Sequence, residues 1–525
     1  MRICYHNLMD DNNQNSQGNQ PPINAEGSKP IFETVTVETP ASNEAPVDLQ
    51  PEEVAPDIVN TSDVAKGGVN PEVIASDQPL VYEESKSKYI IMAVGGIFFI
   101  IIAVFIFFFL LNSLKKGGVG TKKETILTYW GLWEDKEIMD PIIAQYEQKN
   151  PGIKIQYEKK TPEQYREKLI VRTIKGQGPD IFRFHNTWLP ELRDEQTKQF
   201  IPAPIPGEIM TNAEFEKTFY PIHQKDLKMG TKYYGLPLYV DGLVLVYNDS
   251  LFRKAGLNTG PANWDELIED VGKIQVQGKD GEIITAGIAM GTTSNIEHFS
   301  DIFGLVLLLN GGDIASLDST EASGALEAYR RFAEPPNNTW NESMPNAIAA
   351  FVQQKVAMII VPSWELFTIK TADPDLKIKV IPIPKPPGGK QVSLASYWVE
   401  GVSSMSTHQL EAWKFVKFLT QKDTMTKLYE LQSATRLFGE PYSRVDLADL
   451  LIPNEYIGPV IKQAQDDVYV SLPLSSNTFD AGLNDENIRY IQNAINASVK
   501  GVSYSEALQT AKKGIDQVIL RYKIQ

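Results

Sequence analysis

Several loops that follow expected strands bring aromatic and polar side chains together, a combination suited to binding a small polar molecule. A carbohydrate, for example, has apolar C–H faces and a ring of hydroxyl groups, which flat Trp or Tyr rings and a few fixed polar groups match. The candidate ligand-binding residues are Trp130, Trp133, Glu134, Phe184, Asn186, Tyr239, Asp241, Trp364 and Trp398. Each of them, taken singly, more often packs in a core than contacts a ligand. Their shared position at strand ends is what favours a common binding site.

The sequence gives little support to a catalytic role. It has no G-x-S-x-G, P-loop or H-E-x-x-H motif, a single cysteine and five scattered histidines. A glycosidase could use two carboxylates such as Glu134 and Asp241 in an aromatic cleft. Carboxylates beside stacked indoles would also suit a cationic polyamine. We therefore expect no catalytic residue, metal or cofactor, and keep a polyamine-binding protein, a glycoside-cleaving enzyme and a non-transport receptor as alternatives to a carbohydrate-binding protein.

Asp241 is the one carboxylate inside an apolar segment, LPLYVDGLVLVY at residues 236–247. Residues 243–247 are β-branched or aliphatic and aromatic without polar alternation, which is typical of a strand covered on both faces. Burying a lone carboxylate there would cost several kcal/mol. Asp241 therefore needs a ligand, water or a structural partner, such as a turn that its side chain caps.

Composition and charge limit the class of protein. The 525 residues, 42% of them hydrophobic, are enough for two or three ordinary domains. The formal net charge is −16, of which −10 lies in residues 1–88. No basic stripe could neutralise phosphates, so we expect no nucleic-acid partner. Cys4 is the only cysteine, so no disulfide can form within the chain and the fold depends on its core.

The first 123 residues differ from the rest of the chain. Residues 1–88 are rich in proline, amide and acidic residues, which predicts a disordered acidic tail. Residues 89–111 are an uncharged run long enough for a transmembrane helix, and residues 112–123 end in a short polar linker, GGVGTKK. Two lysines precede the apolar run and four follow it, so the charge count alone favours a cytoplasmic C-terminal part.

From residue 124 onward, the pattern is that of an α/β protein. Residues 125–130 read as a strand, a helix follows with apolar residues on one face, and residues 153–157 alternate as a second strand. This strand–helix–strand order predicts a lobe with a mainly parallel sheet.

Two longer segments make the chain recognisable. GLPLYVDGLVLVYNDSLFRKAGL, followed by WDEL, and AIAAFVQQKVAMIIVPSW resemble the extracellular solute-binding proteins of sugar ABC importers, the maltose-binding-like family. GQGPDI at residues 176–181 is similar to that family's GxxPDI turn, and the likeness runs collinearly over residues 124–525. Gln354 stands where the family has a glycine, so a left-handed helix end at this position would be mildly strained.

The resemblance implies the two-lobed periplasmic-binding-protein-like fold (type II). Lobe 1 would comprise about 124–236 and 394–432, and lobe 2 about 237–380 and 433–525, with crossovers near residues 236–241 and 379–396. It also implies ligand roles for Asp241, Trp364 and the loop 130–134. A sugar, mono- or oligosaccharide, would be delivered to an ABC permease by a monomer held at the cell membrane through its single helix. Import requires the binding domain to be extracellular or periplasmic, which overrides the charge count.

Overall fold

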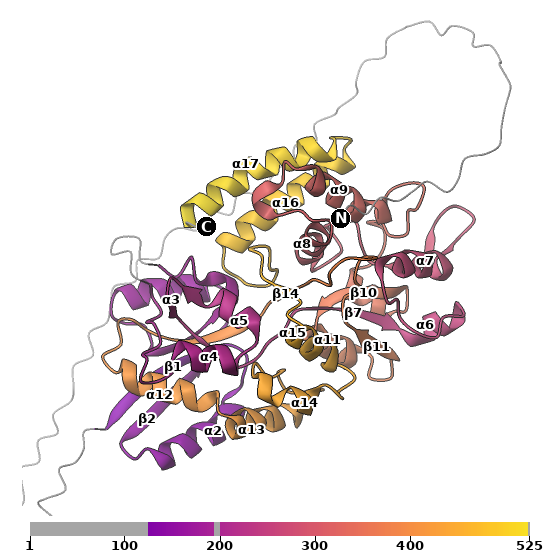
Figure 1. The fold of residues 1–525 in the computed structure, drawn as a ribbon. Coiled ribbons are helices and arrows are strands. Elements are labelled where there is room, and N and C mark those ends of the chain that lie inside the picture. Colours follow the sequence, from indigo (N-terminus) through magenta and orange to yellow (C-terminus); the bar gives the residue numbers. More distant parts are fainter. Residues whose placement is uncertain (1–123, 194–199, 523–525) are drawn as a thin grey trace, which may run out of the picture. The chain divides into compact units, whose positions relative to one another are not determined.

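The computed structural model describes residues 124–193 and 200–522. The expected acidic tail, transmembrane helix and linker, residues 1–123, lie outside these ranges. Among the described residues, no helix combines the length and the apolarity needed to cross a bilayer. All described residues belong to one compact unit of the chain, drawn in colour in Figure 1.

A five-stranded sheet in the order β2-β1-β3-β13-β6 forms the centre of lobe 1 (Figure 1). Its strands are β1 (Thr125–Gly131), β2 (Ile153–Lys159), β3 (Ile181–His185), β6 (Leu236–Pro237) and β13 (Trp398–Val402). β1, β2 and β3 run parallel, whereas β13 is antiparallel to both β3 and β6. The helices of this lobe are α2 (Lys136–Lys149), α3 (Tyr165–Ile174), α4 (Asn212–Thr218), α5 (Pro221–Asp226), α12 (Gln409–Leu419) and α13 (Lys422–Ser433).

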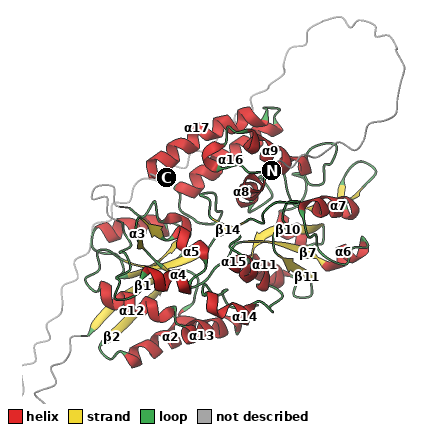
Figure 2. Cartoon of the chain, viewed as in Figure 1, coloured by secondary structure: helices red, strands yellow, loops and turns green. Residues whose placement is uncertain are grey.

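A second five-stranded sheet, in the order β11-β7-β10-β9-β8, forms the centre of lobe 2. Its strands are β7 (Leu243–Asn248), β8 (Val276–Gln277), β9 (Ile283–Ile288), β10 (Val356–Pro362) and β11 (Ile378–Ile381). β10 runs parallel to β9 and antiparallel to β7. The helices are α6 (Asp249–Lys254), α7 (Trp264–Ile274), α8 (Phe299–Leu309), α9 (Thr320–Arg330), α10 (Ala347–Val352), α11 (Glu365–Ala372), α16 (Leu483–Val499) and α17 (Tyr504–Tyr522). Figure 2 shows helices around the strands of both sheets, so the expected α/β architecture is confirmed.

Local sequence signals explain where several of these helices begin and end. The Asn248 side chain caps α6 by accepting a hydrogen bond from the Leu251 amide at 3.1 Å. Gly256 follows that helix in the left-handed conformation, with φ of 78°. α7 buries Leu267, Val271 and Ile274 on one face, as its apolar spacing predicts. Capping and periodicity therefore determine these elements locally.

The chain passes between the two sheets more than once. The first passage lies between Pro237, the end of β6, and Leu243, the start of β7; the second lies between β11 and β13. Both overlap the crossover ranges expected from the sequence. Beside them, β12 (Ser393–Leu394) pairs in parallel with β14 (Tyr469–Val470). After α13, the chain continues through α14 (Ala448–Leu451) to α15 (Gly458–Gln465), which contacts both α5 and β7.

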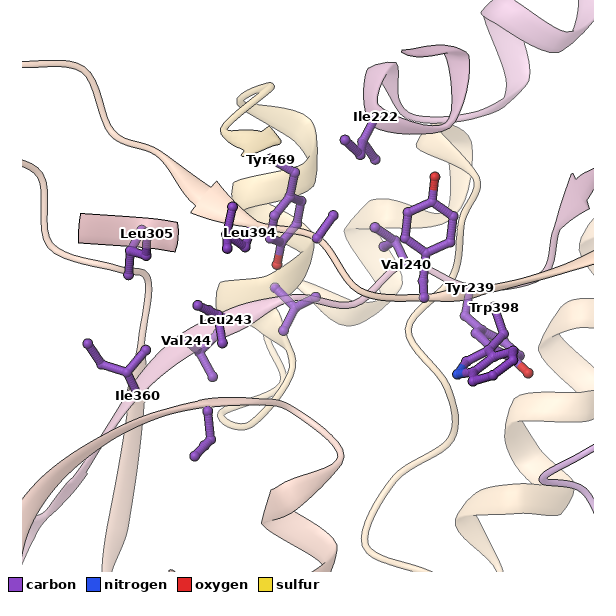
Figure 3. Packing of buried hydrophobic residues seen from close by; sticks show 14 of the residues in the cluster. Ile222, Tyr239, Val240, Leu243, Val244, Leu305, Ile360, Leu394, Trp398 and Tyr469 are labelled. Carbon is purple, nitrogen blue, oxygen red and sulfur yellow. The ribbon is translucent and has the colours of Figure 1, made fainter. Parts of the chain in front are cut away.

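One hydrophobic cluster extends across these passages. It includes Val244 and Ile360 of the second sheet and Trp398 of the first. Figure 3 shows Leu394 and Tyr469 between them, close to Leu243 and Val240 of the first passage. The passages are therefore buried in the same core as the two sheets. This packing limits the routes along which one lobe can move relative to the other.

Gln354, just after α10, has the left-handed conformation that the sequence predicts, with φ of 56°. A residue with a Cβ atom is strained there, and glycine is not. We predict that Gln354→Gly raises the free energy of unfolding by about 0.5–1 kcal/mol. The adjacent Gln353 has φ of −74°. Glycine relieves no strain at position 353, so Gln353→Gly should lower the free energy of unfolding. Equal effects of the two substitutions in chemical denaturation would contradict this explanation.

Candidate functional site

A cavity of about 450 Å³ lies between structural elements of the two lobes. Lobe 1 contributes the loop after β1, the end of β3 and the start of β13, and lobe 2 contributes the first turn of α11. The first passage, the segment after α13 and the loop before α16 complete the wall. The lining residues are Trp133, His185, Tyr239, Asp241, Trp364, Phe367, Thr368, Ser396, Tyr397, Trp398, Arg436, Glu440, Asn477 and Phe479. The volume is in the range of small-molecule sites.

Five of the nine candidate residues from the sequence line this cavity: Trp133, Tyr239, Asp241, Trp364 and Trp398. Trp133 and Trp398 meet edge to face, with ring centroids 5.4 Å apart. Trp364 comes from the opposite lobe, where it precedes α11 directly. Aromatic rings from both lobes therefore contribute to the wall of one cavity.

Trp130 and Phe184 are not among the residues that line the cavity. β1 continues to Gly131, so Trp130 lies within the strand rather than beyond it, and its ring contacts Tyr165 of α3 and the Lys160 ammonium group at 4.3 Å. Phe184 is fully buried in β3 beside Phe182. Trp188 packs behind the cavity with its ring centroid 5.1 Å from that of Trp398. These rings support the wall rather than form it.

Glu134 and Asn186 also lie behind the wall. Glu134 forms an ion pair with the buried Arg183, whose Nε donates to Glu400 at 2.7 Å, and Glu134 accepts a hydrogen bond from the Tyr239 hydroxyl at 3.2 Å. A buried guanidinium needs such partners because an unpaired charge in a core is costly. The Asn186 amide donates to Asp226 and accepts from the Tyr397 backbone amide. Ligand contact by either residue stays a prediction that this geometry does not favour.

Asp241 lies at the cavity, and its carboxylate already has protein partners. One oxygen accepts from the Gly242 amide at 2.7 Å and from the Ser363 amide at 3.2 Å, and the other accepts from the Ser363 hydroxyl at 2.7 Å. Burial raises the pKa of Asp241 to about 7, although these hydrogen bonds oppose the shift. Asp241 therefore has structural partners of the kind considered from the sequence. Because Asp241 also lines the cavity, it can still form a hydrogen bond with a ligand.

Sequence reasoning missed several lining residues. His185 ends β3, where its Nε2 lies 3.0 Å from the Ser396 hydroxyl, and burial lowers its pKa to about 3, so the ring is neutral. The expectation that residues at strand ends line the site could have identified His185, since this residue lies between the candidates Phe184 and Asn186. Arg436 pairs with Glu440 at 2.8 Å and stacks on Phe367 at 4.8 Å. No local sequence pattern marks Arg436 and Glu440 as cavity residues. They lie in the segment after α13 and reach the cavity only because the fold brings that segment beside the other lining segments.

The cavity lining combines aromatic rings with hydroxyl, amide and charged side chains. Among the described residues, no group of three or more His, Cys, Asp or Glu side chains has the geometry of a metal site. Residues 131–426, more than half of the chain, match the sequence model of the family described as bacterial extracellular solute-binding protein.

The chain belongs to this family.

Individual relatives agree with the assignment. A binding protein of Brucella abortus is 29% identical over 337 residues, covering 60% of this chain and 78% of the relative. The multiple sugar-binding protein of Streptococcus mutans is 24% identical over 356 residues, covering 62% and 78%. A solute-binding protein of an ABC transporter from Thermotoga lettingae, solved with α-D-tagatose bound, is 24% identical with a TM-score of 0.57, covering 75% of this chain and 100% of that one. The structural likeness confirms the periplasmic-binding-protein-like fold.

A charged cluster stabilises the lobe 2 wall of this solute-binding protein. The buried His298 has its Nε2 3.1 Å from Glu365 of α11 and its Nδ1 2.7 Å from the hydroxyl of Ser476. Asp301 accepts from the Ser476 amide at 3.2 Å. His298 therefore joins α11, which follows Trp364, to the loop that carries Asn477. Glu365 is thus an ion-pair partner of this histidine.

The protonation of His298 leads to a prediction about pH. Burial alone would lower its pKa, but the hydrogen bond with Glu365 and the negative charges of Asp301 and Glu365 outweigh burial and raise it to about 9. A histidine with a raised pKa stabilises the fold fully below its unfolded pKa of about 6.5 and loses this contribution as pH rises through 9. We expect the free energy of unfolding to fall by about 2 kcal/mol between pH 7 and pH 9.5.

His298→Gln should be less stable at pH 7 and should lack most of this pH dependence in chemical denaturation. Lysine and tyrosine titration contributes equally to both proteins in the window, so the difference between the two curves isolates His298. Parallel curves for the wild type and the variant would show that His298 is neutral in the fold.

Proposed function

We propose that this solute-binding protein captures a carbohydrate in the cavity between its lobes and delivers it to an ABC permease, without chemical change to the ligand. The observation that supports this most is the set of Trp and Tyr rings that both lobes present to one cavity. Such rings match the C–H faces of a sugar, and the polar groups between them match its hydroxyls. The sugar-binding relative of Streptococcus mutans and the tagatose-bound relative of Thermotoga lettingae support the same ligand class.

The carboxylates of the cavity favour a sugar over a polyamine. A polyamine needs free negative charge beside its ammonium groups. The Asp241 carboxylate already accepts hydrogen bonds from Ser363 and Gly242, and Glu440 forms an ion pair with Arg436. These groups can still accept hydrogen bonds from hydroxyls, and burial raises the pKa of Asp241 to about 7, which leaves that carboxyl group only partly charged at neutral pH. A neutral polyol fits this balance better than a polycation.

The glycosidase alternative loses the pair of residues on which it depended. Hydrolysis needs two carboxyl groups on either side of one glycosidic bond. Asp241 lines the cavity, whereas Glu134 lies behind it in an ion pair with Arg183. Capture without cleavage is therefore the simpler function of this site.

Delivery to a permease gives a role to the N-terminal part of the sequence. We propose that residues 89–111 anchor the protein in the cell membrane, with residues 124–525 outside the cell as a monomer. An anchor keeps the binding domain at high local concentration beside its permease. Protease added to intact cells should then remove the binding domain, and protection of that domain would contradict this orientation.

A ligand panel tests the function directly. Thermal unfolding of the full-length protein in detergent should shift upward with a mono- or oligosaccharide, by the equivalent of about 2.7 kcal/mol at a hundredfold excess over Kd. A shift with spermidine alone would favour the polyamine alternative. New products from an oligosaccharide would favour the hydrolase.

Trp364→Ala should reduce sugar affinity at least tenfold, about 1.4 kcal/mol, because it removes an aromatic wall. The matched control is Trp130→Ala, which removes an indole outside the cavity and should lower stability while leaving affinity unchanged. Calorimetric titration measures both. Equal losses of affinity in the two variants would show that Trp364 acts through the fold and not by contact.

A further inference from the structure

A second cavity of about 540 Å³ adjoins the first on the surface of lobe 2. It lies along α10 and α11, with Ala349 on one helix and Ala372 on the other. Thr368 and Asn477 line both cavities, so the two spaces meet at these residues. Both side chains are exposed. We call this second space the α10–α11 groove.

The α10–α11 groove has the chemistry of a site for hydroxyl groups. Its polar lining includes the carboxyl groups of Glu297 and Glu365 and the amides of Asn346 and Gln353, beside the apolar Ile348. Glu365 is paired with His298 at 3.1 Å. Burial raises the pKa of Glu297, and the charge of His298 and a hydrogen bond with Asn346 oppose this shift. As in the first cavity, the acidic groups act as partnered acceptors rather than as free charges.

The junction between the two spaces is held by a loop with unusual backbone geometry. Asn477 and Phe479 both line the first cavity and have φ of 58° and 56°. Asn tolerates the left-handed region, but a bulky Phe is rarely found there. The loop keeps this conformation through the Ser476 bond to His298 and through the Asp480 carboxylate, which accepts from the Asn484 side chain at 2.7 Å. Strained positions that the surrounding structure maintains are common at ligand sites.

We propose that the solute is a neutral oligosaccharide, with one end held among the rings of the first cavity and the following sugar units in the α10–α11 groove. This inference rests on the proposed function and extends it from a class of ligand to its length. The first cavity has aromatic walls, which suit ring stacking. The groove has none among its described lining residues and would bind through hydroxyl contacts with acidic and amide side chains. Thr368 and Asn477 would contact the sugar where it passes from one space to the other.

The test compares ligand lengths in full-length protein by calorimetric titration. The probes are glucose, maltose and maltotriose, and mannose, mannobiose and mannotriose. In at least one series, we expect the trisaccharide to bind at least tenfold more tightly than the monosaccharide. Equal affinities of the three sugars in every series that binds would overturn the inference and leave the proposed function intact. Failure of all six sugars to bind would contradict the proposed function and the inference together.

A groove-filling variant locates the additional units. Ala372→Trp places an indole in the groove from α11, and Thr371→Trp places one on the neighbouring exposed position, which does not line the groove. Ala372→Trp should reduce trisaccharide affinity about tenfold, to that of the monosaccharide, and leave monosaccharide affinity unchanged. Thr371→Trp should change neither.

A second variant guards against a local folding defect at the end of α11. Gln353→Trp fills the same groove from the end of α10, at an exposed position. It should reproduce the selective loss of trisaccharide affinity with an unchanged thermal midpoint in the absence of ligand. The same trisaccharide affinity in Ala372→Trp, Gln353→Trp and Thr371→Trp would place the longer ligand elsewhere and overturn the inference.

Discussion

The hydrogen bonds between Asp241 and Ser363 connect the first passage between the sheets to the start of α11. A carboxylate buried at this depth is tolerated only because three donors approach it. The consequence is geometric. Tyr239, two residues before Asp241, and Trp364, one residue after Ser363, are held on opposite sides of one cavity by a single cluster of hydrogen bonds. Without these hydrogen bonds, the position of one lobe's aromatic wall relative to the other's would not be fixed.

Each lobe supports its aromatic wall with a buried charged group. In lobe 1, Arg183 lies between Glu134 and Glu400, and Glu134 reaches the hydroxyl of Tyr239. In lobe 2, His298 lies between Glu365 and Asp301, beside Trp364. Because removal of the central cation would leave two buried carboxylates unpaired, such clusters define a single arrangement of their neighbours.

The passages between the sheets are the segments at which the two lobes could move to admit a ligand, although the wall of each lobe is rigid. Solute-binding proteins of two lobes enclose a ligand by hinge motion at the segments that join the lobes. In this chain, those segments are buried in the shared core around Leu394 and Tyr469 (Figure 3). A hinge motion that keeps this shared core packed would rotate the two lobes about the passages. A ligand that contacts both Trp398 and Trp364 would stabilise the closed arrangement, which is the form a permease could distinguish.

The amino-acid sequence by itself determined the α/β class, the caps of α6 and the buried face of α7, whereas the left-handed turn at Gln354 was expected from the likeness to the family. These features depend on side-chain spacing and on contacts within a few residues, which a single segment contains. It also indicated five of the aromatic and acidic residues at the cavity, because strand ends at the same edge of a sheet come together. Tertiary structure decided the rest. Arg183 and Glu400 are 217 positions apart in the sequence, so no local pattern could show that they pair. The same arginine also pairs with Glu134 and holds it behind the wall. Arg436, Asn477 and Phe479 reach the cavity from late segments of the chain, because the physical position of a side chain depends on how distant segments pack and not on its neighbours in sequence.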